Sequence, residues 1–280
     1  MQIAETIRRI SYSPSICAYI GRLGLRGFMQ RLYALIWGNA GTVKLNLNNV
    51  EALFSAQTPF ELRCVEGTWF SEREVLSAVQ KRLNPGDTFL DVGSNLGIFT
   101  VFAAKAVGPQ GTVVACEPET NAHNRLRKNI EINQLHNVRP LKLALSDRCS
   151  MKKLLLGDAG TVVQSAHLSD AEGPFEDVQT ADYDSLIANE GFPTPHVVKM
   201  DIEGHEYVAM RGMRGALSSP SCVALFCEVH PSALPSGISA ADVVKLIESF
   251  GFEPISTRKR GAEFQVTAMK PPREVRILTS

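Results

Sequence analysis

The chain has 280 residues, and its 29 basic side chains balance its 29 acidic ones. This balance argues against a nucleic-acid-binding protein, and no apolar run reaches the roughly 18 residues that a membrane span needs. The N-terminus shows no secretory signal and the six cysteines form no C-x-x-C pair, so we expect a cytoplasmic protein with reduced thiols.

Residues 1–65 differ in character from the rest of the chain, and we expect them to form an N-terminal extension to a larger domain at residues 66–280. Residues 1–45 contain six basic residues and one acidic residue. The apolar stretch 16–37 has interspersed arginines, which is typical of a basic helix on an acidic membrane or partner. It is equally typical of a helix that packs on the larger domain or on a neighbouring subunit. We favour this second interpretation, because three glycines at residues 21–27 weaken a long helix.

The segment before the core predicts strands followed by a helix. Residues 42–66 predict two or three short strands, with apolar and polar side chains alternating at their start. A helix is expected to begin at Ser71, whose hydroxyl would cap it, with Glu74 three residues later completing a capping box. The turn at residues 84–87 would end this helix after Leu83.

A glycine turn between a strand and a helix stands at the centre of the chain. Residues 88–90 favour a strand, residues 91–97 (DVGSNLG) form the turn, and residues 98–105 suit a buried helix. Glycines let the backbone pass close to a ligand, and a helix N-terminus supplies free N–H groups. The aspartate could equally cap the helix, and the glycines could equally serve close packing. The candidate ligand-binding residues of this turn are Asp91, Gly93, Ser94, Asn95 and Gly97.

A carboxylate follows the next predicted strand. Residues 113–116 end at Glu117, at the position where dinucleotide-binding folds place an acid that accepts hydrogen bonds from the ribose hydroxyls. The glycine spacing G-x-x-x-G differs from the G-x-G-x-x-G of those folds. It fits a nucleoside ligand without a pyrophosphate, for which S-adenosylmethionine is the obvious candidate. Asp147, after a third strand at residues 138–145, could accept the adenine amino group or lie in a simple turn.

The rest of the chain alternates strands and helices, apart from an ambiguous segment at residues 150–180. This alternation predicts an α/β fold with a doubly wound, mostly parallel sheet that helices cover on both faces. Helices are expected at residues 120–133, 181–188, 206–217 and 240–250, and strands at residues 196–200, 222–227, 253–256 and 263–269.

Five stretches together carry a resemblance to a known family: residues 87–100 (DTFLDVGSNLGIFT), 114–133 (VACEPETNAHNRLRKNIEIN), 144–147 (ALSD), 199–206 (KMDIEGHE) and 225–231 (LFCEVHP). Their order resembles the FkbM-type family of S-adenosylmethionine-dependent methyltransferases. The resemblance implies a Rossmann-like class I methyltransferase fold with a C-terminal antiparallel strand. It also implies methyl transfer from S-adenosylmethionine to a hydroxyl of a sugar, a glycolipid or a secondary metabolite. Family members often have Ala where this chain has Ser94.

Two groups of polar residues follow the later strands, and we expect them to face the methyl acceptor. Asp201, Glu203 and His205 follow the fourth strand, and Glu228 and His230 follow the fifth. The carboxyl ends of parallel strands meet at one edge of a sheet, so a carboxylate or a histidine here could take the acceptor's proton. Alternatively, Glu228 and His230 only hydrogen-bond each other and the Asp201 loop. A divalent metal is conceivable because three carboxylates and two imidazoles converge, but the group has no recognised metal-ligand spacing, and we expect no metal.

One further candidate and three other functions complete the interpretation. Glu72 could approach the cofactor from the helix before the core, although an acid in a first helical turn also favours the helix dipole.

A nicotinamide-dependent oxidoreductase would need the missing G-x-G-x-x-G motif. A non-catalytic scaffold would keep the fold and bind a partner through its basic N-terminal region. A nucleic-acid methyltransferase would carry an Asn/Asp-Pro-Pro-aromatic motif after the fourth strand, so we expect a small-molecule or carbohydrate substrate and no nucleic acid.

Overall fold

The computed structural model describes residues 41–57, 59–156, 167–168, 173–253 and 255–270. The chain divides into two compact units, Met1–Ser77 and Ala78–Ser280. The basic helix expected at residues 16–37 lies outside the described residues. Among the helices that are described, none combines the length and the hydropathy needed to cross a bilayer.

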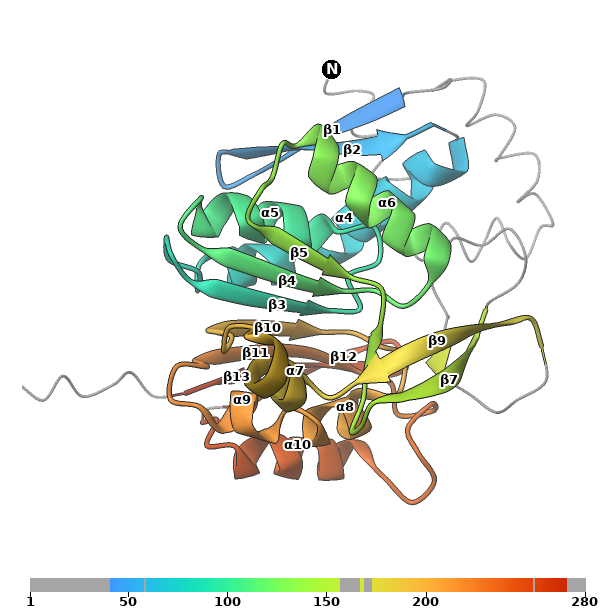
Figure 1. Ribbon diagram of the computed structural model, residues 1–280, viewed down its shortest axis with the longest axis vertical. Helices are drawn as coiled ribbons and strands as arrows, with labels where there is room; N and C mark the ends of the chain where they lie inside the picture. The colour runs from blue at the N-terminus through green and yellow to red at the C-terminus, as the bar shows by residue number, and fades with distance from the viewer. Residues whose placement is uncertain (1–40, 58, 157–166, 169–172, 254, 271–280) are drawn as a thin grey trace, which may run out of the picture. The chain divides into compact units, whose positions relative to one another are not determined.

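The N-terminal unit contains a β-hairpin followed by a helix (Figure 1). Strands β1 (Gly41–Leu47) and β2 (Val50–Ala56) pair in antiparallel fashion. Asn48 and Asn49 connect them with φ values of 50° and 65°, the left-handed conformation that a tight hairpin turn requires. The expected strands are therefore present at residues 41–56, but they do not continue to residue 66.

The helix after the hairpin begins earlier than its sequence pattern predicts. Helix α4 spans Pro59–Gln80, with proline at the first helical position and Glu61 in the first turn. Ser71 therefore lies inside the helix, where its hydroxyl donates to the carbonyl of Thr68 at 3.2 Å. The prediction of a capping box at Ser71 and Glu74 is wrong. A serine hydroxyl can bond back to the preceding helical turn as readily as it can cap a helix, so a serine alone does not mark a helix start.

The larger unit is built on a seven-stranded sheet in the order β12-β13-β11-β10-β3-β4-β5 (Figure 1). Strands β11, β10, β3, β4 and β5 run parallel. At one edge β13 pairs antiparallel with β11, and β12 pairs antiparallel with β13. The predicted α/β fold with a C-terminal antiparallel strand is confirmed. The strands are β3 (Thr88–Val92), β4 (Thr112–Cys116), β5 (Val138–Leu141), β10 (Val197–Met200), β11 (Ala224–Val229), β12 (Ile255–Arg260) and β13 (Glu263–Met269).

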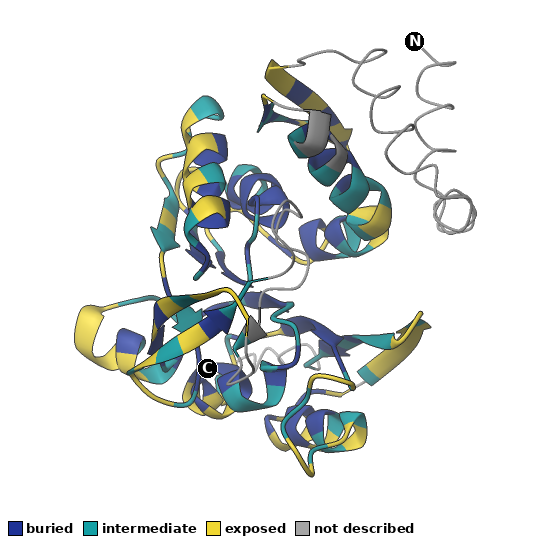
Figure 2. Ribbon diagram, turned by 90° about the vertical axis from the view of Figure 1, so that its right-hand side faces the viewer, coloured by how far each residue is buried: buried dark blue, intermediate teal, exposed yellow. Residues whose placement is uncertain are grey.

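Helices cover this sheet and leave its central strands buried (Figure 2). Every residue of β3, β10 and β11 is buried, as expected for parallel strands covered on both faces. Helix α5 packs against β3 and β4, α6 against β5, and α10 against α8 and β13. The helices are α5 (Ile98–Val107), α6 (Thr120–Ile132), α7 (Tyr183–Glu190), α8 (Glu206–Arg211), α9 (Arg214–Ser218) and α10 (Ala240–Ser249).

Two expected elements are each divided in the structure. The strand expected at residues 138–145 becomes β5 in the main sheet and β6 (Ala144–Leu145) in a second, four-stranded sheet. The helix expected at residues 206–217 becomes α8 and α9, which are interrupted at Gly212. A Cβ atom at Gly212 would lie 1.9 Å from the carbonyl oxygen of Ser146, so the backbones meet where only glycine fits.

The ambiguous segment forms most of the second sheet. Its strands lie in the order β6-β9-β7-β8, with β7 (Ser150–Leu155) antiparallel to β9 (Phe175–Ala181) and to the short β8 (His167–Leu168). Strand β6 pairs parallel with β9 and is followed directly by Ser146 and Asp147. This sheet therefore carries one of the predicted cofactor-binding residues.

Candidate functional site

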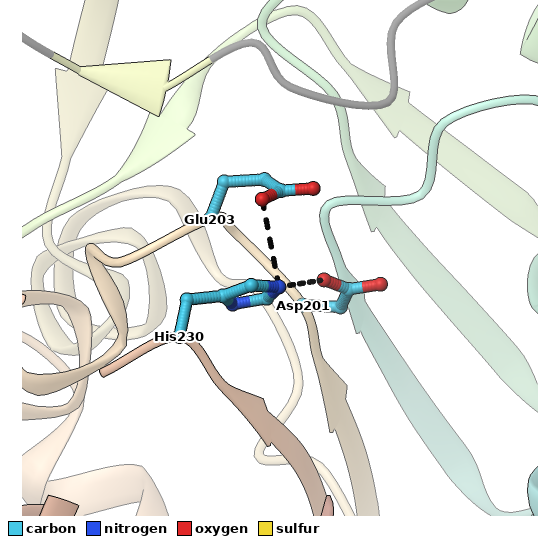
Figure 3. A group of neighbouring side chains, drawn as sticks. All are labelled: Asp201, Glu203 and His230. Carbon is cyan, nitrogen blue, oxygen red and sulfur yellow. Dashed lines mark ion pairs between the residues drawn. The ribbon is translucent and has the colours of Figure 1, made fainter. Parts of the chain in front are cut away.

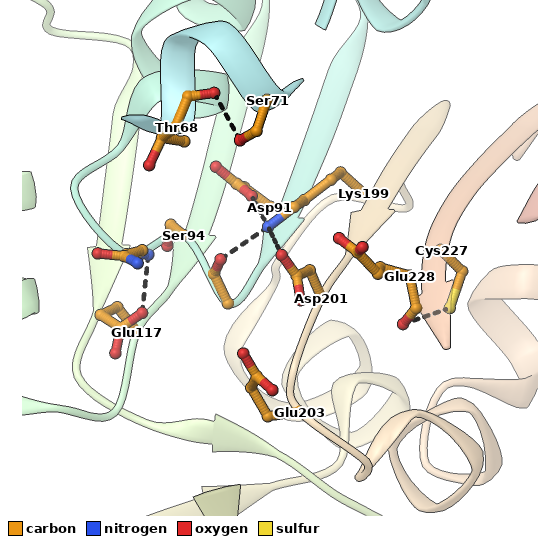
Figure 4. Close-up of polar contacts among 12 residues, drawn as sticks. Thr68, Ser71, Asp91, Ser94, Glu117, Lys199, Asp201, Glu203, Cys227 and Glu228 are labelled. Atoms are coloured by element: carbon orange, nitrogen blue, oxygen red, sulfur yellow. Dashed lines mark hydrogen bonds and ion pairs between the residues drawn. The ribbon is translucent and has the colours of Figure 1, made fainter. Parts of the chain in front are cut away.

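Most of the predicted site residues of the larger unit lie at or just after the carboxyl ends of its parallel strands (Figure 4). The turn after β3 and the turn after β10 are in direct contact. Gly93 has a φ of 76°, and a Cβ atom there would lie 2.0 Å from the carbonyl oxygen of Asp201. A side chain at this position would separate the two turns, so Gly93 joins the predicted cofactor and acceptor regions.

Backbone hydrogen bonds attach the glycine turn to the end of β4. The N–H groups of Gly93 and Ser94 donate to the carbonyl of Cys116 at 3.0 and 3.1 Å. Gly97 has a φ of 81° and precedes α5, and a Cβ atom there would lie 2.5 Å from a methyl group of Leu126. The close-packing explanation therefore applies to both glycines, and their contact with a ligand stays a prediction.

Glu117 is a fixed carboxylate at the end of β4. It is 5% exposed, and its Oε2 accepts from the N–H of Asn95 at 2.8 Å and its Oε1 from the N–H of Glu119 at 3.0 Å. Burial raises its pKa to about 7, although these two N–H groups favour the ionised form. A carboxylate can accept further hydrogen bonds, so Glu117 keeps the capacity to bind two ribose hydroxyls.

A buried lysine links the glycine turn to the acceptor region. The Nζ of Lys199 donates to the carbonyl of Gly93 at 2.8 Å, and it lies 3.7 Å from Asp91 and 3.8 Å from Asp201 (Figure 4). Asp91 is fully buried and accepts a 2.5 Å hydrogen bond from the hydroxyl of Thr100. Burial raises the pKa of Asp91, while Lys199 opposes this effect. Asp91 thus binds a side chain of α5 rather than capping it.

Three of the five predicted acceptor-side residues come together (Figure 3). The Nε2 of His230 lies 3.8 Å from an oxygen of Asp201 and 3.5 Å from an oxygen of Glu203. Its Nδ1 lies 2.8 Å from the carboxylate of Glu206, which is fully buried. We call Asp201, Glu203 and His230 the acidic–histidine cluster.

The acidic–histidine cluster has perturbed proton affinities. Burial lowers the pKa of His230, but the hydrogen bond to Glu206 and the nearby carboxylates outweigh it and raise the pKa to about 9. Burial raises the pKa of Glu203 to about 7, although His230 opposes the shift. Without a bound cation, His230 is therefore the positive charge that balances these acids.

The other two predicted acceptor-side residues have different partners. His205 shares a 3.0 Å hydrogen bond with the hydroxyl of Ser146, and burial lowers its pKa to about 4. Glu228 lies 3.4 Å from Arg260, and among the described residues it shares no hydrogen bond with His230. The mutual hydrogen bond considered for Glu228 and His230 is replaced by the bond from His230 to Glu206. A catalytic role for His205 or Glu228 stays a prediction.

Two cofactor candidates lie in other parts of the fold. Asp147 follows β6, and a hydrogen bond from Arg148 lowers its pKa although partial burial opposes this shift. Glu72 belongs to α4 in the N-terminal unit. The roles of both in cofactor binding stay predictions.

Two residues of the site were not predicted from the sequence. Lys199 interrupts the apolar strand β10, and a charged residue in a buried strand is rare unless it is paired, so its partner could have been sought. Glu206 opens α8, where an acid is ordinary in a first helical turn, so nothing local marks it as the partner of His230.

Comparisons with known proteins identify the family. Residues 91–254 match the methyltransferase FkbM domain. The hexuronic acid methyltransferase AglP of Haloferax volcanii is 28% identical over 193 residues, which cover 67% of this chain and 74% of AglP. A probable cobalt-precorrin-6B C(15)-methyltransferase of Sulfurisphaera tokodaii is 40% identical over 67 residues, covering 24% of this chain and 35% of that protein.

A solved structure of an FkbM methyltransferase from Methylobacillus flagellatus is 13% identical with a TM-score of 0.46, covering 71% of this chain and 59% of that one. The domain match includes the glycine turn, Glu117 and the Asp201 loop, and it extends over more than half of the chain. The protein therefore belongs to the FkbM family of methyltransferases, as its sequence motifs predict.

Proposed function

We propose that this protein transfers the methyl group of S-adenosylmethionine to a hydroxyl oxygen of a sugar or a related small molecule. The single observation that carries the proposal is the contact between Gly93 and Asp201, which places the predicted cofactor turn directly beside the acidic–histidine cluster. A methyl donor bound in the turn would thus meet an acceptor bound at the cluster.

The residues around the turn fit such a cofactor. Glu117 would hold the ribose, the turn from Asp91 to Gly97 would hold the methionine part, and Asp147 would hold the adenine. The cofactor would supply an activated methyl group on a positively charged sulfur. In the transfer the sulfur–carbon bond breaks, a carbon–oxygen bond forms, and the acceptor's hydroxyl proton leaves.

The acidic–histidine cluster would position the acceptor. Asp201 and Glu203 are about one-third exposed at 31% and 33%, so their oxygens can reach a bound molecule. They would accept hydrogen bonds from its hydroxyl groups and take up the proton that leaves. Alignment of the two reactants alone can supply roughly 7 to 11 kcal/mol in ideal cases.

The similarity to AglP supports a carbohydrate acceptor. A hexuronic acid offers both hydroxyl and carboxylate oxygens. Methylation of a hydroxyl would give an ether that resists mild base, whereas methylation of the carboxylate would give an ester that mild base cleaves. This difference separates the two products in an assay.

The test combines cofactor binding with an acceptor screen. S-adenosylmethionine and S-adenosylhomocysteine are titrated calorimetrically into the wild type, Glu117→Ala, and the matched control Glu131→Ala, whose side chain lies exposed on α6. We expect binding to the wild type and the control, and loss of binding in Glu117→Ala. Sugars and uronic acids are then screened with labelled cofactor, and products are treated with mild base.

No cofactor binding to the folded wild type would overturn the proposal, and the scaffold interpretation would then lead. Unchanged affinity in Glu117→Ala would remove the ribose assignment.

A further inference from the structure

The acidic–histidine cluster also has the composition of a metal site. One oxygen of Asp201, one oxygen of Glu203 and one ring nitrogen of His230 all lie within 4.8 Å of one another. Carboxylate oxygen and imidazole nitrogen are ligands of divalent transition metals. Ligands that lie roughly 2.1 Å from one ion are about 3 to 4 Å apart, so small side-chain movements would bring these three atoms to a common cation.

His230 distinguishes this group from an ordinary cluster of acids. The residue is 6% exposed, and its Nε2 points toward the space between the two carboxylates (Figure 3). Among the described residues, Nε2 makes no hydrogen bond, and its two neighbours at 3.5 and 3.8 Å are at ion-pair distance. A buried ring nitrogen that points at two carboxylates without a close partner fits a metal ligand.

Glu206 holds the imidazole in the orientation that a metal ligand needs. Its Oε1 forms a 2.8 Å hydrogen bond with the Nδ1 of His230 and also accepts from the N–H of Gly204 at 2.9 Å. A histidine that binds a metal usually donates its other ring nitrogen to a carboxylate, which fixes the tautomer and the ring. Here that arrangement would present the Nε2 lone pair to the carboxylates of the cluster.

Charge and access favour a cation at the same place. Three carboxylates, those of Asp201, Glu203 and Glu206, surround the imidazole of His230. They outnumber the two basic groups beside them, His230 and Lys199, whose Nζ lies 3.8 Å from Asp201. Since Asp201 and Glu203 are partly exposed, an ion can enter and keep open positions for other ligands. The contact of Gly93 with Asp201 places these positions beside the cofactor turn.

We propose that Asp201, Glu203 and His230 bind one divalent transition-metal cation, such as Mn²⁺, and that this cation holds oxygen atoms of the methyl acceptor. The second part rests on the proposed function, whereas binding of the ion does not. Glu206 acts as a positioning residue for His230.

The first experiment measures Mn²⁺ binding without any turnover. The full-length chain is stripped with EDTA and titrated with MnCl₂, and free Mn²⁺ is followed by electron paramagnetic resonance. We expect one Mn²⁺ bound per chain. S-adenosylhomocysteine binding is measured on the same sample, so that the two proposals are tested separately.

Variants assign the ligands. Glu203→Gln and Asp201→Asn keep side-chain size and should each weaken Mn²⁺ binding by at least 10-fold, and His230→Ala should abolish it. Glu206→Gln should weaken it by roughly 10- to 100-fold, the usual effect of removing the group that orients a ligand. The matched control Glu131→Gln removes an exposed carboxylate from α6 and should bind as the wild type does. Circular dichroism confirms folding, and the partly exposed Glu203 keeps the test valid if His230→Ala does not fold.

Each outcome bears on one proposal. Cofactor binding without Mn²⁺ binding would overturn the cation site and identify the cluster as an ion-pair network, while the proposed function would stand. Mn²⁺ binding without cofactor binding would overturn the proposed function, while the cation site would stand. Equal Mn²⁺ affinity in the wild type and in Glu203→Gln would also overturn the cation site.

Discussion

The two halves of the site are built in different ways. The turn after β3 is held by backbone hydrogen bonds to β4, and Glu117 is held by the N–H groups of Asn95 and Glu119. The ends of β10 and β11 are instead connected through charged side chains around His230. The geometry of the first half therefore depends on backbone bonds and a buried carboxylate, whereas that of the second half depends on the balance of side-chain charges.

Lys199 and Gly93 are two of the points at which these halves meet. Lys199 reaches from β10 to the glycine turn, and Gly93 contacts Asp201. Substitutions at these points and within each half should therefore separate backbone effects from charge effects.

The largest effect is expected for Gly93→Ala. The new methyl group would meet the carbonyl oxygen of Asp201 at 2.0 Å in a left-handed backbone conformation. We expect the free energy of unfolding to fall by about 4 kcal/mol or more, because neither backbone segment can move away without breaking its own hydrogen bonds. Urea unfolding measures this free energy. Gly86→Ala is the matched control, since Gly86 also has a positive φ but has nothing within 4 Å, and it should cost about 1 kcal/mol. Equal losses in the two variants would show that the two halves are not in tight contact.

Lys199→Met should destabilise the protein by about 3 to 5 kcal/mol, because it leaves the buried Asp91 without its compensating charge. The double variant Lys199→Met/Asp91→Asn should recover a large part of this loss. Chemical denaturation of the four proteins in the cycle gives the coupling free energy. Additive losses would mean that Lys199 acts on Gly93 and Asp201 and not through Asp91.

The pH dependence of stability tests the burial of Glu117. Its pKa rises from 4.5 to about 7 on folding, so the folded state holds the proton more tightly than the unfolded state. This contribution to stability is present below pH 4.5 and is lost as the pH rises to 7, by up to about 3 kcal/mol. Glu117→Gln cannot titrate, so the wild type should lose stability relative to this variant between pH 4.5 and pH 8. Parallel stability curves for the two proteins would contradict the raised pKa of Glu117.

Ser94→Ala should have the smallest effect. The hydroxyl of Ser94 donates to the carbonyl of Cys116 at 3.0 Å, beside two backbone bonds to the same oxygen. Its removal should cost about 1 kcal/mol and leave S-adenosylhomocysteine affinity nearly unchanged, because the N–H groups of Gly93 and Ser94 still hold the turn on Cys116. Calorimetric titration of this variant measures its S-adenosylhomocysteine affinity. A tenfold loss of affinity would show that the hydroxyl contacts the ligand.

The sequence by itself determined the features that depend on neighbouring residues. The glycine turn, the acid after β4 and the alternation of strands and helices are local patterns, and together they predicted the fold. The family came from the resemblance that five sequence stretches carry. Local patterns also predicted the ends of β10 and β11 as the acceptor side. The start of α4 was predicted wrongly from local patterns, because Ser71 and Glu74 fit a helix interior as well as a cap.

Tertiary structure alone decided which side chains meet. Glu206 is the partner of His230, Lys199 lies between Asp91 and Asp201, and His205 turns toward Ser146. The division of the strand expected at residues 138–145 likewise depended on a second sheet whose strands come from later in the chain. The physical reason is that periodicity and turn chemistry act between neighbours in the chain, whereas burial and charge pairing act across space and select partners only once the sheet has formed.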